Sequence, residues 1–107
     1  MPVKNLTRAK IEIPKNDIIE FCRRHHILKL ALFGSALRDD FRFDSDIDML
    51  VEFEPKHVPG LIRLTGMEIE LSKILGNRKV DLNTPLSLSK YFREEVLTEA
   101  EVLYVEA

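Results

Sequence analysis

Two short, largely apolar runs separated by an acidic, turn-rich segment constrain the fold of this chain more than any other feature. Residues 28–33 lead into Gly34-Ser35, and residues 47–53 follow the acidic segment. Short apolar runs that are bounded by turn residues are typical of buried strands. Because the second run is apolar on both faces at its centre, we expect it inside a sheet that is covered on both sides.

The rest of the chain supplies helices to cover such a sheet. Residues 14–17 predict a helix start, with Asn16 or Asp17 near the cap, and this helix should end near residues 25–26. Residues 61–75 carry an apolar stripe at three- and four-residue spacing that stops before Gly76. The stripe consists of Leu64, Met67, Leu71 and Ile74. A strand at 79–83, a helix at 89–99 and a closing strand at 102–105 complete the prediction. This order predicts an α/β (α+β) fold with a small mixed sheet and flanking helices.

Length and composition restrict the class of protein. The 107 residues fit a single domain, 1–107, in which residues 1–13 form a loose arm or a short initial strand. The lone Cys22 excludes a disulfide scaffold and is interpreted as a helix packing residue. A net charge of −2 gives no basic field for nucleic acid. No apolar run is long enough for a membrane span, and the N-terminus lacks the apolar stretch of a signal peptide, so the cytoplasm is the expected compartment.

The acidic segment is either a solvated loop or a divalent-metal site. Residues 36–54 carry seven Asp or Glu against two Lys or Arg. Most of these carboxylates are expected to be solvated or loop-forming (Asp39, Asp40, Asp44, Glu52 and Glu54), although Glu52 shares a face with Asp46 and Asp48 and could lie behind them. Residues two apart on a strand lie on one face, about 7 Å from each other. The pair Asp46 and Asp48 would therefore repel unless a hard cation such as Mg²⁺ lies between them.

Gly34-Ser35 adds a second element of the same chemistry. Glycine lets the backbone approach a ligand closely, and neighbouring N–H groups together with a serine hydroxyl can contact phosphate. A phosphate-binding turn beside a carboxylate pair is what metal-assisted phosphoryl or nucleotidyl transfer requires. The competing EF-hand interpretation of residues 44–55 fails, because its glycine and glutamate positions hold Met49 and Pro55.

The combination of a strand, Gly-Ser, ten residues, Asp-x-Asp and an apolar strand resembles the nucleotidyltransferase superfamily with the DNA polymerase β-like fold. More closely, it is similar to the minimal nucleotidyltransferases that are paired with HEPN proteins in toxin–antitoxin systems. The resemblance covers nearly the whole chain after about residue 15. The matching residues are Gly34, Ser35, Arg38, Ser45, Asp46, Ile47, Asp48, Leu50, Val51, Gly76, Val80, Asp81, Leu82, Thr84, Pro85 and residues 100–104.

This resemblance implies roles for individual residues. Asp46 and Asp48 would bind two Mg²⁺ ions that hold the triphosphate, and Asp81 would share the second ion and help to activate the acceptor hydroxyl. Gly34 and Ser35 would contact the phosphates. Arg38 could reach a phosphate, or it could pair with a carboxylate of its own loop (Asp39, Asp40 or Asp44).

The chain departs from the family's usual pattern at two positions. Asp39 replaces a frequent glycine, which leaves the shape of that loop open. His26 stands where relatives often end a helix with glycine, so we expect it to cost stability and to touch no chemistry. His25 and His26 together are interpreted as structural residues that suit the C-terminal end of a helix dipole.

The function implied by the resemblance is Mg²⁺-dependent transfer of AMP from ATP to a hydroxyl. The acceptor would be a tyrosine of a partner HEPN ribonuclease toxin, with which the chain would form a hetero-oligomer; neither a membrane nor direct nucleic-acid binding is expected. One alternative is a non-catalytic antitoxin that neutralises the toxin by binding. The other is a transferase for a small molecule such as an aminoglycoside, which would usually need added elements to shape an acceptor pocket.

Overall fold

The computed structural model describes residues 5–6, 12–34, 45–91 and 93–106. In this part of the chain the main sheet has four strands in the order β5-β4-β3-β6. The strands are β3 (Ile27–Phe33), β4 (Ile47–Phe53), β5 (Val80–Asn83) and β6 (Glu101–Val105). β3 runs antiparallel to both β4 and β6, whereas β4 and β5 are parallel. The predicted mixed sheet is thereby confirmed, and the two apolar runs of the sequence are its central strands.

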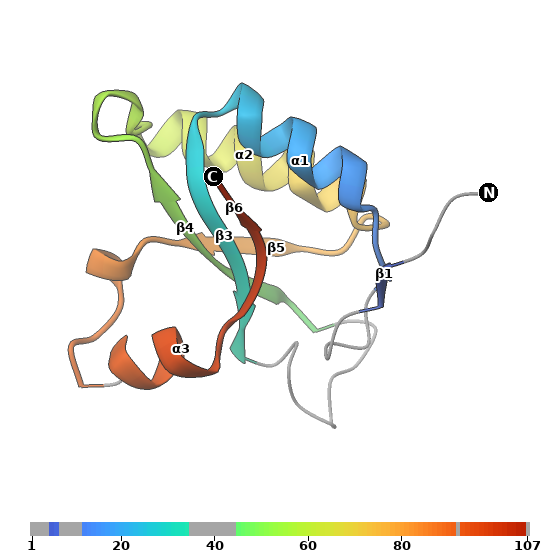
Figure 1. Cartoon of the computed structure of the whole chain (residues 1–107). Helices are drawn as coiled ribbons and strands as arrows, with labels where there is room; N and C mark the ends of the chain where they lie inside the picture. Colours follow the sequence, from blue (N-terminus) through green and yellow to red (C-terminus); the bar gives the residue numbers. More distant parts are fainter. Residues whose placement is uncertain (1–4, 7–11, 35–44, 92, 107) are drawn as a thin grey trace.

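Helices cover the two faces of the sheet unequally (Figure 1). α1 (Lys15–Arg24) and α2 (Leu61–Ile74) lie side by side on one face, and the shorter α3 (Arg93–Glu99) lies toward the other. The predicted stripe of α2 faces the sheet, since Met67 and Leu71 are buried and Leu64 and Ile74 pack partly against the core. Within the described ranges, no helix is both long and apolar enough to cross a membrane.

The alternation of side chains along β4 divides the core into two clusters. Ile47, Met49 and Val51 belong to the large cluster beneath α1 and α2. Leu50 points to the opposite face, where it packs with Ala31 and Leu88 in a small cluster. Because successive strand residues alternate between faces, Asp48 shares the face of Leu50. The thinly covered face is therefore the one that carries the carboxylates of β4.

Two predicted helices differ from the structure in detail. α1 begins within the predicted start at residues 14–17, but its N-cap is Pro14, so Asp17 lies in the first turn, where its charge still suits the helix dipole. The last helix begins at Arg93, not at residue 89. Ahead of it, Pro85–Ser87 forms the 3-10 turn η3, after which Leu88 is extended and buried in the small cluster. Burial of Leu88 against the sheet takes the chain out of a helical path at this point.

Ile13 connects the N-terminal segment to the main body. β1 (Asn5–Leu6) pairs antiparallel with β2 (Glu12–Ile13), with Asn5 opposite Ile13. Ile13 is buried in the large cluster. The end of the arm is thus anchored by core packing before α1 begins.

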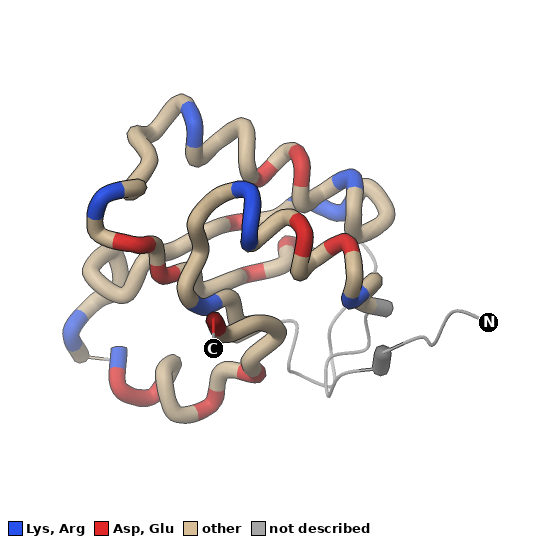
Figure 2. Tube along the Cα trace, turned by 45° about the horizontal axis from the view of Figure 1, so that its top comes forward, with Lys and Arg blue, Asp and Glu red and all other residues tan. Residues whose placement is uncertain are grey.

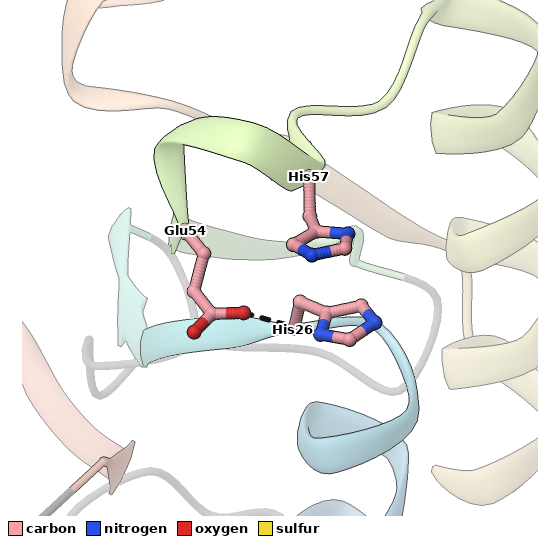
Figure 3. Close-up of side chains that lie close together, drawn as sticks. All are labelled: His26, Glu54 and His57. Atoms are coloured by element: carbon pink, nitrogen blue, oxygen red, sulfur yellow. Dashed lines mark hydrogen bonds and ion pairs between the residues drawn. The ribbon is translucent and has the colours of Figure 1, made fainter.

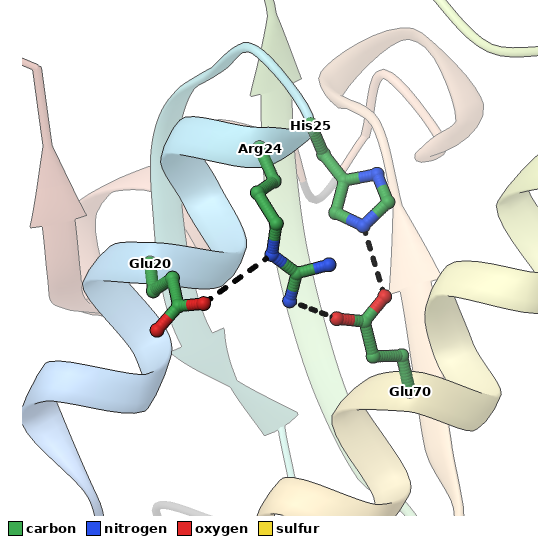
Figure 4. Close-up of polar contacts among 4 residues, drawn as sticks. All are labelled: Glu20, Arg24, His25 and Glu70. Carbon is green, nitrogen blue, oxygen red and sulfur yellow. Dashed lines mark hydrogen bonds and ion pairs between the residues drawn. The ribbon is translucent and has the colours of Figure 1, made fainter.

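A polar network bridges α1 and α2 (Figure 4). Arg24 donates a hydrogen bond to Glu70 Oε2, and His25 Nε2 lies 3.0 Å from Glu70 Oε1. Arg24 Nε also lies 3.8 Å from Glu20 Oε1 on its own helix. Partial burial raises the pKa of Glu70, but the hydrogen bonds from Arg24 and His25 outweigh that effect and hold the pKa below its usual value. Charges of both signs occur along both helices (Figure 2).

Candidate functional site

The strand register brings the predicted carboxylates together. β4 and β5 are paired so that Asp48 lies opposite Asp81, and β3 is paired so that Phe33 lies opposite Asp48. Asp46 directly precedes β4. The N–H of Ile47, the first residue of β4, donates a hydrogen bond to the carbonyl of Lys79 at 2.8 Å. Residues from three separate parts of the sequence therefore meet at one end of the sheet.

Asp48 and Asp81 project from the same face. Val80 and Leu82 are buried in the large cluster, so Asp81 between them faces the other way, as Asp48 does between Ile47 and Met49. Neighbouring strands are about 4.8 Å apart, so the two acidic residues are direct neighbours across the ladder. Two adjacent carboxylates repel each other, and a cation between them removes this repulsion.

Gly34 lies against the Asp48 carboxylate. It has a φ of 71°, in the left-handed region that favours glycine. A β-carbon at this position would come within 2.6 Å of Asp48 Oδ2. The chain can therefore leave β3 directly beside the carboxylate only because residue 34 has no side chain.

Lys79 is a cation of this site that the sequence analysis missed. Its Nζ lies 3.7 Å from Asp46 Oδ2, and both side chains are largely exposed. An exposed ion pair at this distance contributes little to stability. The signal in the sequence was a lysine immediately before the Val80-Asp81-Leu82 strand, but only the pairing of β4 with β5 shows which carboxylate it meets.

Glu68 is a second residue that the sequence analysis missed. Its Oε2 accepts a hydrogen bond from the backbone N–H of Leu82 at 2.7 Å. β5 is an edge strand, and this N–H faces away from the sheet ladder toward α2. Glu68 thereby connects α2 to the edge strand at the residue next to Asp81.

The residues present fit a hard divalent cation. Asp46, Asp48 and Asp81 offer only oxygen donors, which is the donor type that Mg²⁺ prefers. The backbone at Gly34 leaves open the space that a β-carbon would fill beside Asp48. These three carboxylates are the residues that would hold such ions.

Of the predicted site residues, the structure places Gly34, Asp46, Asp48 and Asp81 at the same end of the sheet, with Asp48 opposite Asp81 and next to Gly34. Ser35 and Arg38 lie outside the described residues, as do the loop carboxylates with which Arg38 could pair. Glu52 lies further along β4, where its partner in the register with β3 is Lys29.

Comparison with known proteins identifies the class. The family model described as polymerase beta, nucleotidyltransferase, matches residues 16–107. The chain therefore belongs to the polymerase β nucleotidyltransferase family and is a nucleotidyltransferase, which confirms the resemblance, the fold and the enzyme class expected from the sequence.

One curated relative and two solved structures show which members of the family the chain is similar to. The protein adenylyltransferase MntA of Thermococcus cleftensis is 37% identical over 86 residues, which cover 80% of this chain and 82% of that protein. A solved toxin–antitoxin structure with AMP-PNP has a TM-score of 0.70 and 25% identity, covering 88% of this chain and 75% of that one. A chain in the complex of a tri-AMPylated Shewanella oneidensis HEPN toxin with its MNT antitoxin has the same fold, with a TM-score of 0.61 and 24% identity over 86% of this chain and 70% of that one.

Proposed function

We propose that the protein is an antitoxin that transfers AMP from ATP, in a Mg²⁺-dependent reaction, to a tyrosine hydroxyl of a partner HEPN toxin. The observation that carries this proposal is the pairing of Asp48 with Asp81 beside the open backbone of Gly34. Paired carboxylates beside a glycine backbone suit phosphoryl chemistry, in which positioning and charge neutralisation do most of the work.

Each residue has a defined task in the reaction. Asp46, Asp48 and Asp81 would hold the metal ions, and the positive charge of these ions would offset the negative charge of the triphosphate. The backbone at Gly34 and the Ser35 hydroxyl contact the phosphates, and Arg38 is a further candidate for this contact. Asp81 also accepts the proton of the acceptor hydroxyl.

The bonds balance without a further reactant. The acceptor oxygen attacks the α-phosphorus of ATP, the bond from this phosphorus to the oxygen that bridges it to the β-phosphorus breaks, and pyrophosphate leaves with that oxygen. The products are the AMP ester of the acceptor, pyrophosphate and one proton.

A protein acceptor is supported by the relatives and by the surface. The relative at 37% identity is a protein adenylyltransferase, and the structural neighbour at 25% identity is a toxin–antitoxin structure that contains AMP-PNP. Large apolar side chains are also exposed on α2, where Leu61 is 83% and Ile62 is 92% accessible. Exposed apolar residues that lie close together are typical of protein–protein contact.

The test is neutralisation of the cognate toxin as a function of the antitoxin ratio, with intact-mass spectrometry of the toxin. With ATP and Mg²⁺, substoichiometric antitoxin should silence the toxin and add the mass of AMP to it. Asp48→Asn and Asp81→Asn should each abolish the mass change. Glu106→Gln is the matched control, because this exposed carboxylate follows β6 beside Leu28 at the opposite end of the sheet.

The alternatives predict different outcomes. If the antitoxin acts only by binding, neutralisation should need about one antitoxin per toxin. It should also be independent of ATP and unchanged by Asp48→Asn. A small-molecule transferase would consume ATP with a low-molecular-weight acceptor and leave the mass of the toxin unchanged. Either result would refute modification of the toxin.

A further inference from the structure

Three side chains with metal-binding atoms meet at the end of the sheet opposite the carboxylate site. His26 lies directly before β3, Glu54 directly follows β4, and His57 is the last residue of η2 (Pro55–His57). One ligand atom of each lies within 4.8 Å of those of the other two. Figure 3 shows the two rings and the carboxylate gathered on one side of the strand ends.

The backbone beneath this cluster is fixed by hydrogen bonds. In the β3–β4 register Ile27 lies opposite Phe53, so the residues just outside this pair, His26 and Glu54, are also neighbours. Glu54 N–H donates to the carbonyl of His26 at 3.0 Å, and His57 N–H donates to the carbonyl of Glu54 at 2.8 Å. The three side chains therefore start from positions that the sheet and the 3-10 turn determine.

The side chains are already near the spacing that one ion requires. His26 Nδ1 lies 3.1 Å from Glu54 Oε2. Ligand atoms of a tetrahedral Zn²⁺ site, with bonds of about 2.1 Å, lie about 3.4 Å from each other. The ring of His57 stacks on that of His26, with a centroid distance of 3.7 Å and an interplanar angle of 12°. Both rings are exposed, so His57 can turn out of the stack to aim a nitrogen at the same point.

We propose that His26, Glu54 and His57 form a second metal site, which takes Zn²⁺ with water completing its coordination. Two imidazoles and one carboxylate suit a borderline ion such as Zn²⁺, whereas the three carboxylates at the other end suit Mg²⁺. A hollow of about 370 Å³, lined by Leu28 and residues 54–57, adjoins the cluster and leaves room for the water. The two sites lie about 20 Å apart, because the length of β3 separates them.

The bound ion would cross-link two segments of the chain. It would join the turn between α1 and β3 to the connection between β4 and α2, and so strengthen the links that one backbone hydrogen bond, the His26–Glu54 contact and the stacked rings already provide. An ion that binds only the folded state raises stability. The proposal concerns residues outside the nucleotidyltransferase site and does not depend on the identity of the acceptor.

The experiment is a calorimetric titration of the full chain with Zn²⁺ in excess Mg²⁺, combined with thermal unfolding. The background variant carries Asp46→Asn and Asp48→Asn, which weakens the carboxylate site as a competing Zn²⁺ site. We expect one Zn²⁺ per chain and a higher unfolding midpoint with Zn²⁺. His57→Ala and Glu54→Gln should each weaken Zn²⁺ binding by about tenfold or more. Loss of a residue that only hydrogen-bonds to a metal ligand already lowers metal affinity by that factor.

His26→Gly removes a ligand without endangering the fold. His26 has a φ of 56°, which glycine adopts more readily than histidine, so this variant should unfold no more easily than the parent in the absence of metal. His25→Ala is the matched control, because the third histidine of the chain contacts Glu70 and lies outside the cluster. Loss of Zn²⁺ binding in His26→Gly with retention in His25→Ala supports the site. Equal binding in His26→Gly and the parent, or no binding in the parent, overturns it.

Discussion

Gly34 combines two constraints at one residue. Its φ of 71° is unfavourable for any residue with a β-carbon, and such a carbon would also collide with the Asp48 carboxylate. The first constraint concerns folding, and the second concerns the orientation of a proposed metal ligand. A substitution here therefore affects stability and activity together, whereas the same substitution at Gly66, where nothing lies within 4 Å of an added β-carbon, avoids the collision.

We expect Gly34→Ala to lower the free energy of unfolding by about 1–2 kcal/mol from the left-handed backbone alone. Displacement of the Asp48 carboxylate should in addition reduce AMP transfer at temperatures where the variant is fully folded. Urea unfolding and transfer assays on the same preparation measure the two effects. The control is Gly66→Ala within α2, where alanine favours the helix and should leave transfer intact. Full activity of Gly34→Ala would contradict the proposed role of this contact.

Elements whose pattern is complete within a short window were predictable from the sequence. β4 and the apolar stripe of α2 needed no information from elsewhere, because alternation and helical spacing already define their buried faces. The start of α3 was not predictable, since burial of Leu88 against Ala31 and Leu50 of the sheet decides it. Local sequence cannot indicate a contact that depends on the sheet being formed.

The same limit decides which residues of the candidate sites could be predicted from the sequence. Asp46 and Asp48 follow from their spacing, whereas Asp81 was assigned only through the family resemblance, because its partner depends on the register of β4 with β5. Lys79 was missed for this reason, and Glu68 was missed because its contact with Leu82 depends on how α2 packs against β5. The cluster of His26, Glu54 and His57 was missed because the pairing of β3 with β4 brings its members together across 28 residues.

At the level of elements, the network between α1 and α2 predicts a pH dependence of stability. The pKa of Glu70 is lower in the folded chain than its ordinary value of 4.5, so its ionised form stabilises the fold. This contribution is complete above that value and is lost as the pH falls through the lower folded pKa. Glu70→Gln should therefore be slightly less stable than the parent at pH 7, with the difference shrinking as the pH falls below 4.5.

Thermal unfolding of both proteins across this pH range is the measurement for Glu70. Glu20→Gln is the matched control, because Glu20 is more exposed and lies 3.8 Å from Arg24, and its effect should be smaller. A difference between Glu70→Gln and the parent that stays constant down to low pH would show that the charge of Glu70 does not stabilise the helix pair.

At the scale of the whole molecule, Cys22 lies where α1 packs on the sheet. It is fully buried in the large cluster, and burial raises the pKa of its thiol to about 12. The same cluster includes Leu82 on the edge strand β5. We propose that the chain is a single cooperative domain, so that the thiol becomes accessible only when the whole core opens.

This proposal gives a quantitative prediction for labelling of Cys22 by a thiol reagent. The native chain should react more slowly than the chain in urea by a factor equal to its unfolding constant, because a buried thiol whose pKa is raised by burial reacts only after the core has opened. Leu82→Ala opens a cavity at the far edge of the sheet and should lower the free energy of unfolding by about 2–4 kcal/mol. If opening is global, labelling accelerates by the same factor as the unfolding constant, about tenfold for each 1.4 kcal/mol.

Val105→Ala, at an exposed position of β6, should change neither the labelling rate nor the stability. Labelling that stays slow in Leu82→Ala despite the lost stability would mean that α1 opens separately from β5, and the chain would then not unfold as one unit.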